Sequence, residues 1–167
     1  MEEKFITLTN SCIYPKQGVL LEKGSTDAID LLMKDDIPHL AVAIPESSHI
    51  AICTVKGLII FNQMTKCADQ IINMPKQADA ICCDKSEVTL VAASTLMQFS
   101  PKIKDNSSMY ELVMTAELSD MIKIEHLVKI EEGIFALFDA KGKLSFITLD
   151  SDGTISTIPL KNKIESQ

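Results

Sequence analysis

Short apolar runs recur along the whole chain, and polar turn residues separate them. The runs are rich in β-branched and aromatic side chains, which favour extended strands. They cover residues 5–8, 39–44, 49–53, 58–61, 88–92, 96–99, 134–138, 144–147 and 154–158. Turn signals such as Lys56-Gly57, Lys141-Gly142 and Asp152-Gly153 lie between them. The pattern predicts a chain built mainly from short antiparallel strands.

Two segments leave their secondary structure open. Residues 25–34 begin with Ser-Thr-Asp and continue with apolar positions that would suit a short capped helix. Residues 107–124 carry apolar residues at mixed spacing. Each segment is predicted to be either a helix or an outer strand with a loop.

An apolar strand, a tight turn and a second apolar strand occur three times, at 49–61, 87–99 and 134–147. Leu58, Leu96 and Leu144 hold equivalent places in these hairpins. A further strand is predicted before each hairpin, at 39–44, 78–83 and 124–130, and a fourth after it, at 70–74, 110–114 and 154–158. Four short antiparallel strands in about 40 residues are typical of one β-propeller blade.

Residues 37–160 resemble the divergent WD40-like branch of the β-propeller superfamily, and residues 5–32 resemble a degraded first repeat. The resemblance consists of the repeat length, the number of strands in each repeat and the Leu-x-x-Phe pattern after the turn. The Gly-His and Trp-Asp pairs of typical WD40 blades are absent from the sequence. The predicted fold is therefore all-β, a propeller or partial propeller of about four blades. A β-sandwich or an α+β meander is the alternative.

The repeats define the expected domain organisation. Residues 1–160 are predicted to form a single β-rich repeat domain, and 161–167 a mobile tail. The repeats are expected at approximately 5–36, 37–77, 78–120 and 121–160.

Ring closure stays open at this point. The chain could be a compact four-bladed ring, a half-ring that pairs with another chain, or an excerpt of a longer protein. Pairing of residues 5–8 with 154–158 would close the ring within this chain. An incomplete ring would expose an apolar blade face and predicts a homo-oligomer or a protein partner.

Composition narrows the possible partners. Apolar residues make up 46% of the 167 positions and charged residues 23%, so a core can form. All basic residues are lysines, tryptophan is absent, and the net charge of −7 opposes binding to nucleic acid. No apolar run approaches the roughly 20 residues that span a bilayer, so no membrane insertion is expected.

The number and spacing of the cysteines do not predict a disulfide framework. They are an odd set with one adjacent pair: Cys12, Cys53, Cys67, Cys82 and Cys83. Their apolar surroundings are typical of reduced, structural thiols, and no basic neighbour in sequence activates the adjacent pair. We therefore expect an intracellular protein, cytoplasmic or nuclear.

No catalytic, cofactor or metal site is predicted. His39, His49 and His126 lie at strand edges without a spacing that suits metal ligands. The Asp150-Ser-Asp-Gly153 segment resembles the start of a calcium loop, but Lys161 stands where an acidic ligand is required. A hairpin turn is the better interpretation of that segment.

Charge is distributed unevenly between the predicted loops. The loops between first and second strands are acidic, with Glu46, then Asp84 and Glu87, then Glu131 and Glu132. Those between second and third strands carry Lys56, then Lys141 and Lys143. Because these two loop classes emerge on opposite faces of a propeller, the sequence predicts an acidic face, formed by the five acidic residues, that binds a partner.

The predicted function is a non-catalytic protein–protein interaction scaffold, a subunit or fragment of a larger intracellular assembly. The alternative is a small-molecule-binding or enzymatic propeller that uses the central channel. A β-rich subunit that is stable only with its partner is a third hypothesis.

Overall fold

The computed structural model describes residues 4–33, 36–118 and 123–158. These residues form four antiparallel sheets of four strands, and in each sheet every strand pairs with its neighbours in sequence. Each sheet is called a blade and is numbered along the chain. The predicted tail at 161–167 lies outside the described residues.

The bounds of the strands follow the repeats. Blade 1 consists of β1(Ile6–Thr7), β2(Ser11–Tyr14), β3(Val19–Glu22) and β4(Ala28–Asp30). Blade 2 consists of β5(Pro38–Ala43), β6(His49–Thr54), β7(Gly57–Asn62) and β8(Cys67–Asn73). Blade 3 consists of β9(Ala80–Asp84), β10(Glu87–Ala92), β11(Thr95–Lys104) and β12(Ser107–Glu117). Blade 4 consists of β13(Ile124–Glu131), β14(Ile134–Asp139), β15(Leu144–Leu149) and β16(Ile155–Ile158).

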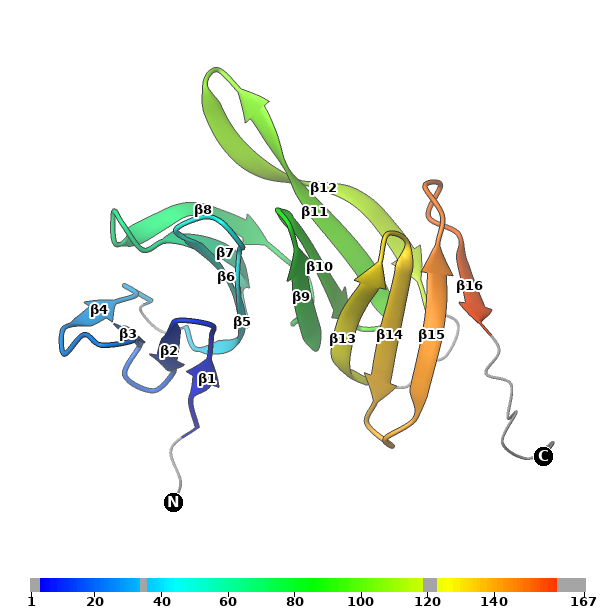
Figure 1. Ribbon diagram of the computed structural model, residues 1–167, viewed down its shortest axis with the longest axis horizontal. Coiled ribbons are helices and arrows are strands. Elements are labelled where there is room, and N and C mark those ends of the chain that lie inside the picture. Colours follow the sequence, from blue (N-terminus) through cyan, green and yellow to red (C-terminus); the bar gives the residue numbers. More distant parts are fainter. Residues whose placement is uncertain (1–3, 34–35, 119–122, 159–167) are drawn as a thin grey trace.

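The blades follow one another around an arc (Figure 1). The first strands of successive blades contact one another, β1 with β5, β5 with β9, and β9 with β13, so they form the inner edge of the arc. Blades 1 and 4 lie at its two ends (Figure 1). Ile6 and Thr7 pair with Ile13 and Cys12, and β16 pairs with β15, so the terminal strands belong to separate sheets.

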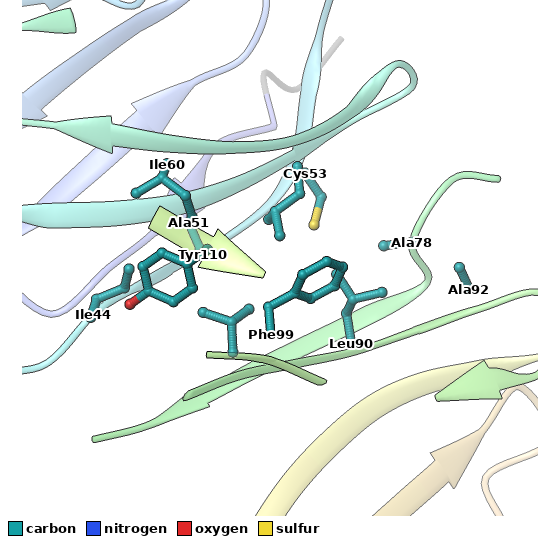
Figure 2. Close-up of a cluster of buried hydrophobic side chains, with 11 residues drawn as sticks. Ile44, Ala51, Cys53, Ile60, Ala78, Leu90, Ala92, Phe99 and Tyr110 are labelled. Carbon is teal, nitrogen blue, oxygen red and sulfur yellow. The ribbon is translucent and has the colours of Figure 1, made fainter. Parts of the chain in front are cut away.

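Three apolar clusters hold adjacent blades together. The first joins blades 1 and 2, the second blades 2 and 3, and the third blades 3 and 4. Figure 2 shows the middle cluster, in which Ala51, Cys53 and Ile60 of blade 2 face Leu90 and Phe99 of blade 3. A sheet covered on both faces needs apolar residues at consecutive positions. Accordingly, β6 from Ile50 to Thr54 is buried without alternation.

The three predicted hairpins are confirmed as β6–β7, β10–β11 and β14–β15, each in a different sheet. Neither of the two segments left open is helical in its described residues, and each contributes a strand. Residues 28–30 form β4, and 107–117 form β12. The second segment is extended because it pairs with β11 from Thr95 to Lys104, apart from one irregularity in register.

Candidate functional site

The acidic residues of the sequence prediction lie at the turns between the first two strands of blades 2, 3 and 4. Glu46 is exposed in the β5–β6 turn, where its φ is 56°. Asp84 and Glu87 end β9 and begin β10, as the residues that flank their turn. Glu131 and Glu132 are exposed at the end of β13 and in the turn that follows it.

A cavity of about 620 Å³ lies where blades 2 and 3 meet. Glu46 and Asp84 both line it, and Asp69 of β8 adds a third carboxylate. Ile44, Ile60 and Tyr110 contribute apolar surface to the same cavity. The structure therefore brings two of the predicted acidic residues to one hollow that also has apolar walls.

A smaller cavity, of about 210 Å³, brings Asp84, Glu87 and Glu132 together where blades 3 and 4 meet. The Nζ of Lys129 lies 3.2 Å from Asp84, 3.4 Å from Glu87 and 3.1 Å from Glu132. Only 7% of the Lys129 side chain is exposed, whereas the three carboxylate side chains are 27–81% exposed. One buried cation thus faces three acidic residues and leaves a surplus of negative charge.

The pKa of Lys129 reflects two opposed effects. Burial favours the neutral amine, but hydrogen bonds to Glu132 and Asp84 and the negative charge of Glu87 outweigh it, so the pKa is raised. Lys129 was not among the residues predicted from the sequence. The sequence does place a single lysine between the apolar Val128 and Ile130 in a predicted strand, which could have marked it as unusual. The neighbouring residues gave no indication that its side chain contacts blade 3.

His49 and Asp69 form a second polar contact, at the edge of the 620 Å³ cavity between blades 2 and 3. The Nε2 of His49 lies 2.7 Å from an Asp69 carboxylate oxygen, which also accepts a 3.1 Å hydrogen bond from the amide of Asn62. The hydrogen bond with His49 lowers the pKa of Asp69 against the opposing effect of burial. Among residues 4–33, 36–118 and 123–158, no three His, Cys, Asp or Glu side chains are grouped to hold a metal ion.

The other two histidines have structural surroundings. The Nε2 of His39 lies 2.8 Å from the carbonyl oxygen of Ala78, at the junction of blades 2 and 3. The ring of His126 contacts that of Phe138 edge-on, with 6.4 Å between the centroids. The segment from Asp150 to Thr154 forms the β15–β16 turn, closed by a 2.9 Å backbone hydrogen bond, as the sequence predicts.

The cysteines are free thiols. Burial raises the pKa of Cys53 to about 12 and that of Cys82 to about 11. Burial also raises the pKa of Cys83 to about 12. Lys129 acts on both adjacent thiols and lowers their pKa, a basic neighbour that the sequence did not show, but burial outweighs it. These thiols are therefore poor nucleophiles.

The lysines of the second loop class lie at the opposite ends of the strands. Lys56 precedes β7, and Lys141 and Lys143 lie in the β14–β15 turn. The backbone N–H groups of Lys141 and Lys143 each donate a 2.9 Å hydrogen bond to the buried carboxylate of Asp139. Successive turns of an antiparallel meander alternate between its two ends, so these lysines and the acidic turns are on different faces.

The fold has counterparts among solved structures. The β-propeller domain of Myceliophteria thermophila Cps50 (Swd1) has a TM-score of 0.69 at 12% identity, with 89% of this chain and 54% of that chain covered. The computationally designed Ika4 protein has a TM-score of 0.61 at 9% identity, with 87% and 89% covered. This chain thus spans about half the length of the Cps50 chain. No protein-family model matches it, and no curated protein does.

The structure and these likenesses define the fold class. The chain has a WD40-like β-propeller fold of four antiparallel blades, as the sequence predicts. The fold by itself does not assign a function. No helix in the described part of the chain is long and apolar enough to cross a membrane.

Proposed function

We propose that this protein is a non-catalytic interaction scaffold whose acidic face binds a basic segment of a protein partner. The acidic face consists of the five residues predicted from the sequence: Glu46, Asp84, Glu87, Glu131 and Glu132. The observation that carries the proposal is the 620 Å³ cavity in which Glu46 and Asp84 stand beside apolar walls.

A lysine or arginine side chain has the chemistry to fill this cavity. Its aliphatic stem would pack on Ile44, Ile60 and Tyr110, while its charged end would reach the carboxylates. Lys129 and Lys85 compensate part of the negative charge, since Lys85 lines both cavities. The carboxylates of the two cavities still outnumber these two lysines: Glu46, Asp69, Asp84, Glu87 and Glu132. The net charge of −7 would also speed the approach of a basic partner.

The wider setting follows from the same features. A scaffold of this kind would act as a subunit of a larger assembly. Free, poorly ionised thiols support an intracellular location, cytoplasmic or nuclear.

The test is a titration of the ¹⁵N-labelled protein with a pentalysine peptide, followed by nuclear magnetic resonance, with pentaglutamine as the uncharged comparison. Pentalysine should shift the backbone amides of residues 44, 46, 47, 84–86 and 110, and pentaglutamine should not. Glu46→Gln should weaken binding by roughly 2- to 5-fold, the size expected for one exposed charge.

Glu125→Gln is the matched control, since Glu125 is an exposed residue at the other end of β13 from Glu131 and its replacement changes the net charge equally. This variant should bind pentalysine like the wild type. Equal weakening by both variants, or shifts spread evenly over the surface, would show attraction by net charge alone and refute the proposal.

A further inference from the structure

Each junction between blades pairs two different sheet faces. We define the trailing face of a blade as the one turned toward the next blade, and the leading face as the one turned toward the previous blade. Leu58 lies on the trailing face of blade 2 and Leu96 on that of blade 3. Both are 0% exposed because the next blade covers them.

Among the described residues, no blade lies beside the trailing face of blade 4. Leu144 occupies the place of Leu58 and Leu96, yet it is only half-buried. Phe138 pairs with Leu144 on this face. The next row of the same face contains one residue from each strand of the blade: Val128, Ala136, Phe146 and Ile158. Val128 is 51% exposed and Phe138 38% exposed.

The leading face of blade 1 is also uncovered and also apolar. Ile13 and Leu20 are buried on its other face, so the alternate positions point away from blade 2. The apolar residues at these uncovered positions are Cys12, Tyr14, Val19, Leu21 and Ala28, and the polar Thr7 and Asp30 lie at the edges of the same face. Phe5, which is 57% exposed, packs beside Tyr14 with 5.9 Å between the ring centroids.

The two open faces are therefore the two halves of one kind of junction. Repeat proteins that end in solution usually carry a polar outer face on the terminal repeats, and neither end of this arc has one. A trailing face is covered by a leading face at all three junctions within the chain. The chain itself carries one of each, at opposite ends of the arc (Figure 1).

We propose that a second copy of this chain covers both faces and completes the ring. Blade 4 of each copy packs on blade 1 of the other, so that one two-fold axis relates the copies and both junctions form together. The ring then has twice four blades, at the upper end of the usual range of about four to eight. The four blades match 54% of the Cps50 propeller chain with a TM-score of 0.69, so the arc has the shape of about half of that propeller.

The first measurement is the mass in solution by light scattering after size-exclusion chromatography, over a range of concentrations. The expected mass is twice 18.4 kDa. A monomer at every concentration would refute the proposal. Larger or growing assemblies would also refute it, because the contact would then be head-to-tail without closing into a ring.

Two variants test the two faces separately. Val128→Glu on blade 4 and Leu21→Glu on blade 1 should each weaken dimerisation about 100-fold or more, since each buries an unpaired carboxylate. Ile103→Glu is the control, because Ile103 is 83% exposed in the β11–β12 hairpin, away from both faces. Circular dichroism checks that each variant folds. Dissociation by only one of the two face variants would contradict the pairing of blade 4 with blade 1.

Cys12 gives an independent readout because it lies on the open face of blade 1. Its alkylation should be slow in the wild-type dimer and fast in Val128→Glu, where the substitution is on the other blade. Equal rates would refute the proposal. Glu46→Gln should remain dimeric and Val128→Glu should still bind pentalysine, so failure of this inference is distinct from failure of the proposed function.

Discussion

Gln70 and Tyr110 join the outermost strands of blades 2 and 3 by two hydrogen bonds. The side-chain amide nitrogen of Gln70 donates to the carbonyl oxygen of Tyr110, and the backbone N–H of Tyr110 donates to the amide oxygen of Gln70, both at 2.7 Å. The apolar cluster lies farther in, so this amide closes the outer end of the junction. Both groups of Tyr110 would lose their partner if the amide were removed.

Gln70→Ala should lower the free energy of unfolding by about 1–3 kcal/mol, the cost of leaving partly buried polar groups unsatisfied. In urea unfolding, the midpoint should fall while the slope stays unchanged. Gln77→Ala is the control, because Gln77 is exposed before β9. If both variants matched the wild type, water would replace the amide without cost and the junction would not depend on Gln70.

Lys129→Met should destabilise the protein by about 1–3 kcal/mol, since the carboxylates of Asp84, Glu87 and Glu132 lose their shared cation. Because the folded pKa of Lys129 is raised, its contribution is fully present below the unfolded pKa of about 10.4 and is lost as pH rises through the folded pKa. The difference in unfolding free energy between variant and wild type should therefore be constant from neutral pH to about pH 9 and shrink at higher pH.

The exposed Lys102 provides the comparison, as Lys102→Met removes the same charge from the β11–β12 hairpin. That variant should differ from the wild type by less than about 0.5 kcal/mol. A Lys129→Met difference that grew with alkaline pH would contradict the assigned ion pairs.

Gly57→Ala should destabilise the protein by about 1–3 kcal/mol through overpacking. A Cβ at this position would overlap the carbonyl oxygen of Ile72 on the adjacent strand, so β7 and β8 would have to separate. Asn73→Ala alters the exposed residue that pairs with Gly57 and adds no atom near Ile72, so its unfolding midpoint should stay close to that of the wild type. A tolerated Gly57→Ala would mean that the strands separate at little cost.

Cys67 should react with a thiol reagent at neutral pH at least about 100-fold faster than Cys53, Cys82 and Cys83. Cys67 is exposed, whereas burial raises the pKa of the other three to about 11 or 12. Mass spectrometry of the alkylated peptides measures each rate. Cys67→Ser should abolish that fast reaction and leave the slow ones unchanged. Rapid labelling of Cys82 in the folded protein would indicate a reactive thiol in blade 3.

The blades could be predicted from the sequence where two adjacent strands are both apolar and a tight turn joins them. Leu58 and Leu96 follow tight turns in apolar hairpins, and this local pattern gave both the repeat and its period. A fourth strand at 110–114 was predicted, but the extension of β11 and β12 to a tight turn was not, although Asp105 and Asn106 suit a two-residue turn and both have positive φ, at 50° and 64°. Mixed apolar spacing after residue 107 concealed the extension, because it reaches beyond the core and its tip has no face to bury.

The candidate site was predictable only in part. The acidic turns follow from the alternation of loops in a repeated meander, so Glu46 and Asp84 were found from the sequence. Lys129 was not, because its partners on blade 3, Asp84 and Glu87, are 42 residues or more away in sequence. Only Glu132, in its own blade, is near it in sequence. Which charges meet across a junction depends on how two sheets pack.

Short paired strands in four repeats could be predicted from the sequence alone, because hydrogen bonding between adjacent strands and the burial of apolar runs act over a few tens of residues. The open arc, the half-buried Leu144 in the place of the buried Leu58 and Leu96, and the carboxylates around Lys129 became visible only in the folded chain. These features depend on the rotation and spacing between blades. Contacts between distant segments set both, and no local pattern encodes them.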